Sequence, residues 1–176
     1  MSFPPDLPLL EAERVDLLWS GDVLSAVVAG VERADERIDV AMFILEVVAA
    51  SEAHNRVREL LDAIARAARR GVRVRVLIDD PRDEATRLVI NELAAQYLLA
   101  SGVEVRYDLR EEASNHSKFV LIDSAETIVG SGNWSAGGLL RNLEAGVRVV
   151  SPPLGRLLGF RFDRDWADGR PPEPLG

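Results

Sequence analysis

The residues between 116 and 144 have side chains and spacings that suit chemistry on an anionic group. They follow the pattern H-x-K-x4-D-x6-G-S-x-N, followed by N-x-E. An imidazole is a competent nucleophile or general acid and base near neutral pH. An ammonium and amides can hydrogen-bond phosphate oxygens and offset their charge, and a carboxylate can fix the tautomer of an imidazole. The residues in question are His116, Lys118, Asp123, Gly130, Ser131, Asn133, Asn142 and Glu144.

The surroundings of these residues have the composition of β-strands. Stretches 119–122, 127–129 and 144–150 are apolar or β-branched, as strands usually are. Residues two apart on a strand share a face, so three neighbouring strands would bring the polar side chains to one spot. Asp123 lies five positions after Lys118 and turns to the opposite face, so we interpret it as structural. The pairs expected to share a face are His116 with Lys118, Ser131 with Asn133, and Asn142 with Glu144.

The rest of the chain alternates strand and helix patterns. Strands are predicted at 15–19, 37–45, 72–79 and 103–107, and helices at 23–34, 55–70, 85–100 and 154–168. Asp22 is a plausible helix cap, and Asp79-Asp80 is explained more simply by turn chemistry than by a metal site. This order predicts a three-layer α/β/α fold with a central mixed sheet. We expect one domain over 10–168, an irregular segment at 1–9 and a Pro-rich, disordered tail at 169–176.

Composition sets further bounds on function. The 176 residues carry a net charge of −8 and no cysteine, so cysteine-based metal sites and disulfides are excluded. We see no signal peptide and no apolar stretch long enough to span a bilayer, and we therefore expect a cytoplasmic protein without stable membrane insertion. The acidic balance disfavours tight binding of a polyanion, and Glu111 and Glu112 would repel one. A local basic patch remains an alternative, built from Arg141, Arg148, Arg161 and Arg164.

Lys118 is the only lysine in the chain. All other strongly basic residues are arginines, and the single lysine stands two residues after a histidine. This placement favours a functional role for its compact ammonium over chance. His54 is the only other histidine, and no downstream Asp or G-S-x-N pattern accompanies it. A surface or helix-start role is the simpler interpretation of His54, and a zinc site is not indicated.

At these residues the sequence resembles the HKD motif of the phospholipase D superfamily, with every fixed position filled. Its size and single motif look most like the small bacterial endonuclease branch. The resemblance implies a phospholipase D-like fold and hydrolysis through a phosphohistidine, in which two motif copies meet in one site. It implies His116 as nucleophile or acid, Lys118, Ser131 and Asn133 as phosphate ligands, and Glu144 as the residue that orients His116. It requires no metal or other cofactor.

One motif in the chain predicts a homodimer with the active site on its two-fold axis. The first functional hypothesis is a metal-independent phosphodiesterase, a nuclease acting on DNA or RNA. One alternative is a phospholipase D-type hydrolase or transferase acting on phospholipids, although the sequence shows no clear membrane-binding helix. A second alternative, from a different class, is a non-catalytic dimeric module of a defence or repair complex.

Overall fold

The computed structural model describes residues 10–47, 52–80, 85–108 and 114–173, and gives the backbone alone at the helix starts 52–55 and 85–88. Strands and helices alternate over most of this length. Their bounds in chain order are β1 Arg14–Trp19, α1 Gly21–Arg33, β2 Arg37–Met42, α2 Glu52–Arg69, β3 Arg73–Asp79, α3 Ala85–Leu99, β4 Glu104–Asp108, β5 Lys118–Ile122, β6 Glu126–Gly130, the π-helical turn η1 Gly137–Arg141, β7 Ala145–Val150 and α4 Pro152–Asp168.

The strands form one mixed sheet in the order β1-β7-β6-β5-β2-β3-β4. Strands β2, β3 and β4 run parallel, as strands joined through helices do. Strands β5, β6 and β7 are antiparallel neighbours, which confirms the expectation that the three strands around the motif lie side by side. The sheet therefore gathers the motif segments near its centre.

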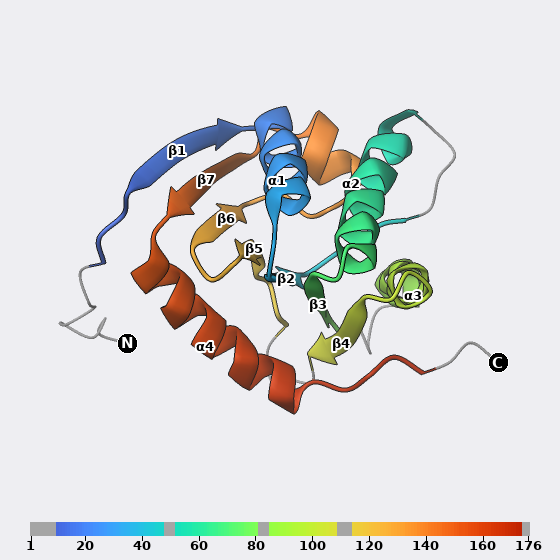
Figure 1. Cartoon of the computed structure of the whole chain (residues 1–176). Helices are drawn as coiled ribbons and strands as arrows, with labels where there is room; N and C mark the ends of the chain where they lie inside the picture. The colour runs from blue at the N-terminus through green and yellow to red at the C-terminus, as the bar shows by residue number, and fades with distance from the viewer. Residues whose placement is uncertain (1–9, 48–51, 81–84, 109–113, 174–176) are drawn as a thin grey trace, which may run out of the picture.

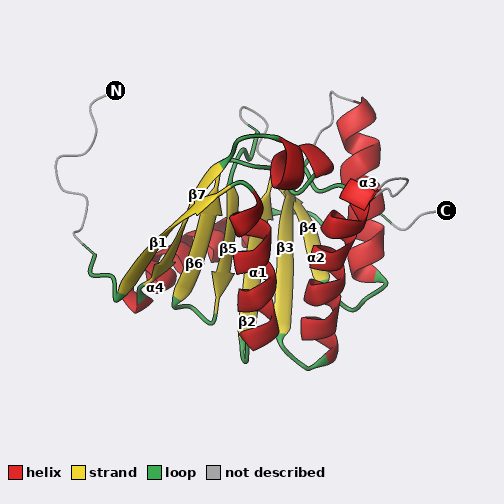
Figure 2. Cartoon of the chain, turned by 90° about the horizontal axis from the view of Figure 1, so that it is seen from above, coloured by secondary structure: helices red, strands yellow, loops and turns green. Residues whose placement is uncertain are grey.

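Helices cover both faces of the sheet, as Figures 1 and 2 show. Helices α1, α2 and α3 pack on one face around a large apolar core, whose members include Leu24, Val57, Leu61 and Leu98. Helix α4 packs on the other face, where Phe162 and Trp166 contact Ala41 and Leu77. The predicted three-layer α/β/α class is confirmed.

Two local predictions are wrong at their edges. Strand β2 ends at Met42 and not at residue 45, because the chain turns away there and Leu45 forms an isolated parallel bridge with Trp134. Asp22 is not the cap of α1: Ser20 occupies that position, and the Asp22 carboxylate accepts a hydrogen bond from the backbone of Trp19 at 3.1 Å. Asp22 is the second residue after the cap, and it reaches back to the residue that precedes the cap.

The first part of the C-terminal tail packs against the domain, contrary to the disorder expected from residue 169. Tyr107 and Arg170 exchange backbone hydrogen bonds of 2.8 and 3.0 Å. The Arg170 guanidinium lies 3.1 Å from the Asp80 carboxylate, and Gln96 donates to the Glu173 carbonyl at 2.8 Å. Proline content alone was a poor guide because these partners come from distant parts of the chain. Residues 1–9 and 174–176 lie outside the described residues.

Candidate active site

His116 and Lys118 lie at the edge of the sheet where the parallel strands end. Lys118 begins β5 and pairs with Met42, the last residue of β2. The Lys118 Nζ is 3.1 Å from the His116 Nδ1 and donates a 2.8 Å hydrogen bond to the His116 carbonyl. The exposed His116 ring packs on Phe43, with 4.3 Å between ring centroids. This edge, at the carboxyl ends of parallel strands, is where open α/β sheets usually bind ligands.

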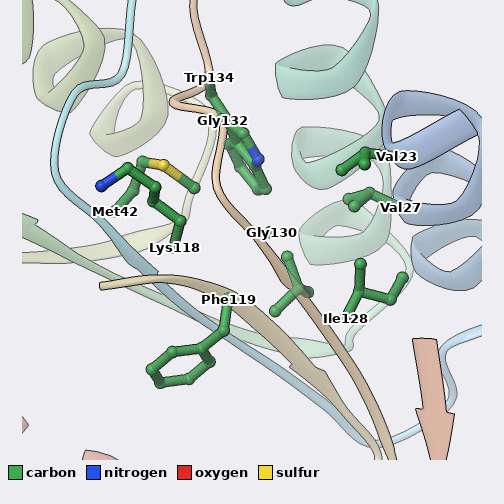
Figure 3. Close-up of a pocket in the computed structure, with 10 residues that line it drawn as sticks. Val23, Val27, Met42, Lys118, Phe119, Ile128, Gly130, Gly132 and Trp134 are labelled. Carbon is green, nitrogen blue, oxygen red and sulfur yellow. The ribbon is translucent and has the colours of Figure 1, made fainter. Parts of the chain in front are cut away.

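The aliphatic part of Lys118 is enclosed by apolar side chains. It lines a cavity of about 10 Å³, and in Figure 3 it lies beside Met42 and the Trp134 indole, with its amine pointing away from helix α1. Lys118 is only 8% exposed. Burial lowers the pKa of Lys118 below its usual 10.5, while the negative charges of Glu144 and Asp79 raise this pKa. A partly desolvated ammonium interacts more strongly with a phosphate than one in bulk water.

The contact between the two side chains decides which imidazole nitrogen carries the proton. An ammonium has donors only, so the Nδ1 of His116 accepts from Lys118 and the proton of the neutral ring lies on Nε2. Nε2–H is also the group from which the imidazolium form of the ring protonates a leaving oxygen, which is the acid role. A nucleophilic Nε2 requires the proton on Nδ1, and hence an acceptor such as a carboxylate in place of the ammonium. The two roles therefore need different surroundings.

Glu144 forms a compact cluster with Ser131 and Asn142. One carboxylate oxygen accepts from the Ser131 hydroxyl, and the other accepts from the Asn142 amide at 3.1 Å. The Ser131 Oγ also accepts from the Ala145 backbone at 3.2 Å. In the part of the chain that the structure describes, Glu144 makes no hydrogen bond to His116. The expected orienting contact is therefore not formed within a single protomer.

Asn133 lies beyond the end of β6, in a segment held by backbone pairing. The period-2 argument that grouped Ser131 with Asn133 does not apply, because β6 ends at Gly130. The next residue, Trp134, donates from its backbone to Ile44 at 3.1 Å, and its buried side chain belongs to the core. The Oδ1 of Asn133 is buried and has no hydrogen-bond partner among the described residues. Buried unpaired polar atoms of this kind need an explanation, and a bound ligand is one.

The glycines that allow the backbone to approach closely in this segment are Gly132 and Gly138, and not the motif residue Gly130. A Cβ at Gly138 would lie 2.3 Å from the Asn133 carbonyl oxygen, and one at Gly132 would lie 2.6 Å from the Gly138 carbonyl oxygen. At Gly130 the nearest atom would be 3.8 Å away, which is ordinary contact. The close backbone approach around Asn133 thus depends on Gly132 and Gly138, to which the sequence pattern assigned no role.

Asp123 lies at the opposite end of β5 from Lys118. Its carboxylate accepts three backbone hydrogen bonds, from Asp35 at 3.1 Å, Glu36 at 2.9 Å and Arg37 at 3.0 Å. It has a left-handed backbone, with φ of 48°. These contacts join the β5–β6 turn to the start of β2, which is what a structural residue would do.

Two further residues, Asp79 and Asn91, support the segment that carries His116 and the strand ends around it, and the sequence analysis assigned neither of them to the site. The Asp79 carboxylate, buried at the end of β3, accepts from the Asn115 backbone at 2.6 Å. The buried Asn91 side chain accepts from the Leu45 backbone at 3.0 Å and donates to the Phe43 and Asp79 carbonyls at 3.0 and 3.1 Å. One signal was available: Asn91 precedes the buried Ala94, Ala95 and Leu98 by three, four and seven residues, so it lies on the buried stripe of α3.

The arginines proposed as a basic patch do not gather at the site. Arg148 lies 2.7 Å from the Glu126 carboxylate and 3.2 Å from that of Asp16, and Arg161 and Arg164 are exposed on α4. Arg141, in η1, adjoins the Glu144 cluster and is exposed. Glu111 and Glu112 lie outside the described residues, as does the side chain of His54. No described helix has the length and apolarity needed to cross a bilayer.

The comparisons with known proteins agree with this fold. The family model described as "Cardiolipin synthase, PLD-like domain" matches residues 27–166, which is most of the chain. The protein therefore belongs to this phospholipase D-like family, as the motif resemblance led us to expect.

Among curated proteins the chain is similar to enzymes named for cardiolipin. It is 32% identical over 113 residues to the mitochondrial cardiolipin hydrolase of Danio rerio, covering 64% of this chain and 48% of that protein. It is 37% identical over 89 residues to cardiolipin synthase B of Escherichia coli strain K12, covering 51% of this chain and 21% of that protein. The chain thus spans less than half the length of these relatives.

Among solved structures the chain resembles Nuc from Salmonella typhimurium, described as a phospholipase D family member. The TM-score is 0.75 at 21% sequence identity, and the match covers 90% of this chain and 97% of that one. At this identity the similarity shows a shared fold, which extends nearly end to end over both chains.

Proposed function

We propose that the protein is a metal-independent phosphodiesterase that works through a phosphohistidine in a two-fold homodimer, with nucleic acid as its substrate. The observation that carries the proposal is the contact between the His116 Nδ1 and the Lys118 Nζ at 3.1 Å. A nucleophile or acid, an ammonium, an amide at Asn133 and a carboxylate at Glu144 come from one edge of the sheet. Lys118 and Asn133 would hold the phosphate oxygens, with Ser131 in support.

The reaction needs two imidazoles in different protonation states. The Nε2 of one histidine attacks phosphorus, forming a P–N bond as the P–O bond to the leaving alcohol breaks. The second histidine, as an imidazolium, gives its Nε2 proton to that alkoxide and becomes neutral. It then takes a proton from water, whose oxygen attacks phosphorus and breaks the P–N bond. Each placed proton transfer contributes on the order of 10²–10⁴ in rate. The second histidine comes from a second copy, because the chain carries one motif.

The geometry within one protomer suits the acid role. The Nδ1 of His116 accepts from Lys118, and Glu144 is bonded to Ser131 and Asn142. For the nucleophilic role a carboxylate has to accept the proton on Nδ1. In the proposed dimer the two copies of His116 take the two roles by turns, and Glu144 orients the one that attacks.

Two substrate classes follow from the same site. Nucleic acid is supported by the size and single motif of the chain and by its near end-to-end match to Nuc. Phospholipid is the second candidate, because the curated relatives at 30% identity and above are named for cardiolipin. A non-catalytic role in a larger complex remains the contrasting hypothesis, against which the filled motif argues.

The test is cleavage of labelled single-stranded DNA in excess EDTA, beside cleavage of cardiolipin-containing vesicles in the same buffer. His116→Ala should abolish product formation, while His54→Ala, a matched loss of the other histidine, should retain it. DNA cleavage that survives chelation supports the metal-independent mechanism and nucleic acid as the substrate. Cleavage of vesicles alone moves the phospholipid substrate ahead. Loss of all cleavage in EDTA, with recovery on adding Mg²⁺, would contradict the metal-independent mechanism.

A further inference from the structure

Helix α4 covers its face of the sheet only in part. It crosses obliquely, from the β7 side toward β4 (Figure 1). Near its start, Gly155 lies against the backbone of Ser124 in the β5–β6 turn, and Gly159 lies against the Leu121 side chain. Farther along, Phe162 and Trp166 pack on Ala41 and Leu77, which belong to β2 and β3. The ends of β1, β7 and β6 nearest the active site are therefore left outside this contact.

Large apolar side chains are exposed on this uncovered area. Leu17, Val147 and Val129 are aligned across the three strands by the pairing register, and Val129 shares its face with Phe119, which packs toward α4. Leu17 is 63% exposed, Trp19 59% and Val129 42%. Leu17, Val129 and Val147 line a shallow hollow that reaches Gly130 and Ala145. We call this area the apolar sheet face.

Among the residues that the structure describes, β1, β7 and β6 contribute no ionisable side chain to the apolar sheet face. Along β1 the residues that share this face are Val15, Leu17 and Trp19, whereas Arg14 and Asp16 alternate onto the other face. On β7, Val147 lies on the apolar face, while Arg148 is paired with Glu126 on the α1 side. The charged side chains of these strands therefore lie on the α1 side, beside the core residues Leu18 and Ile128, and the other side is apolar. Exposed apolar areas of this kind are usually interaction sites.

We propose that the apolar sheet face is the surface on which a second copy of this chain docks. The inference rests on the proposed function, because a site with one histidine per chain is incomplete without a partner. The face is continuous with that site. Gly130 and Ala145 form the rim of the face nearest the site, and in the chain they are the immediate neighbours of Ser131 and Glu144. A two-fold axis beside this rim pairs the same patch from both copies, as closed dimers do, and brings the two His116 side chains toward each other.

The chemistry of the face favours a protein partner over the other candidates. Nucleic acid binding depends on basic side chains that contact phosphates, and the face has none. Binding to an anionic bilayer surface likewise depends on Lys and Arg around the apolar residues, and the chain as a whole has a net charge of −8. An uncharged apolar centre is what the core of a homodimer interface consists of.

The first experiment compares Leu17→Glu with Val89→Glu by sedimentation velocity over a range of concentrations. Both residues are apolar and exposed, at 63% and 57%, but Val89 lies on α3, on the opposite face. The wild type and Val89→Glu should sediment at twice the mass of the chain. Leu17→Glu should raise the dissociation constant of the dimer by about 100-fold or more, because burying an unpaired carboxylate is strongly unfavourable. Far-UV circular dichroism spectra that match the wild type, with a cooperative thermal transition in each variant, would establish that both are folded; loss of the dimer by itself lowers the melting temperature.

A second measurement uses the absence of cysteine from the chain. Leu17→Cys introduces a single thiol that is exposed in one protomer, so it reacts quickly with a maleimide unless a partner covers it. Reaction at Leu17→Cys should slow as the protein concentration rises through the dimer range, while Val89→Cys should react at one rate throughout. Concentration-independent labelling of Leu17→Cys in a dimeric sample would overturn the inference.

The outcomes separate this inference from the proposed function. If Leu17→Glu stays dimeric, the docking surface is wrong, although the dimeric enzyme stands. If the wild type is a fully active monomer, both the two-fold site and the docking surface are wrong. If the wild type is a dimer, Leu17→Glu is a monomer and neither substrate is cleaved, the docking surface stands and the enzymatic proposal fails.

Discussion

Replacing Asp123 should reduce stability and leave the chemistry intact, although Asp123 belongs to the motif. Its carboxylate accepts backbone hydrogen bonds of 3.1, 2.9 and 3.0 Å. Along β5 it is roughly 16 Å from Lys118, at about 3.3 Å per residue. The side chain therefore supports the turn at one end of the strand while His116 and Lys118 occupy the other end.

The magnitude follows from those three hydrogen bonds. Bonds to a charged group contribute about 1.5–3 kcal/mol each when buried and about 0.5–1.5 kcal/mol in ordinary settings. Two of the three are exposed and one is part-buried, so Asp123→Ala should lower the free energy of unfolding by about 2–4 kcal/mol. At about 2–4 °C per kcal/mol this is a fall of roughly 5–15 °C in Tm.

Asp123→Asn should be milder, at about 1–2 kcal/mol. Its Oδ1 can keep the bonds to Glu36 and Arg37, while its amino group faces the Asp35 N–H and loses the third. Asn also tolerates the left-handed backbone at this position, with φ of 48°.

Urea unfolding followed by circular dichroism measures these changes, and phosphodiester cleavage per folded molecule measures the chemistry. Asp35→Ala is the matched control, since this exposed aspartate lies in the same contact and its side chain forms no hydrogen bond or ion pair with the described residues. A change below about 0.5 kcal/mol in Asp123→Ala, the level of ordinary surface substitutions, would refute the structural role. Normal stability with lost cleavage would place Asp123 in the active site.

Three further predictions concern the groups around the site. Burial lowers the pKa of Lys118 below 10.5, so the unfolded chain binds this proton more tightly than the folded chain. Lys118→Met should therefore be more stable than the wild type at pH 7. The difference in unfolding free energy between the two, measured by urea titration, should shrink as the pH rises toward 10.5. A difference that grows with pH would contradict this sign. Glu144→Gln should lower the pKa of Lys118 further, because the negative charge of Glu144 raises it; the single lysine gives one side-chain NMR signal to titrate, and an unchanged or higher pKa would be the contrary result. Asn91→Ala should destabilise by about 2–4 kcal/mol in chemical denaturation, because it removes three side-chain hydrogen bonds to backbone groups of Phe43 and Leu45, which follow β2, and of Asp79 in β3. A loss under about 0.5 kcal/mol would show that these backbone groups find other partners.

Local periodicity was enough to predict most of the elements and the central pair of the site. The alternation of apolar residues predicted the β5, β6 and β7 strands within one or two residues, and helical spacing predicted α1 to α4. His116 and Lys118 are two residues apart, so their contact at 3.1 Å is a short-range property of the chain. Such features follow from the geometry of single elements.

The remaining features of the site depend on elements that are distant in the sequence. The Asp79 carboxylate accepts a hydrogen bond from the backbone of Asn115, which is 36 positions away in the sequence. From helix α3, Asn91 bonds to Leu45, just after β2, and to Asp79, at the end of β3. Within one protomer the carboxylate of Glu144 accepts hydrogen bonds from Ser131 and Asn142, and Ser131 lies just past the end of β6 at Gly130. Strand alternation cannot be extended beyond the last paired residue, and the sequence does not show where that residue is.

The sequence by itself determined the class of chemistry, since residue types and short spacings bring an imidazole and an ammonium together at the start of one strand. Tertiary structure alone decided how buried Lys118 is, which glycines make room for Asn133, and where α4 leaves the sheet uncovered. The reason is that side-chain identity and spacing are local, whereas burial, close backbone approach and exposed apolar faces depend on how whole elements pack against one another.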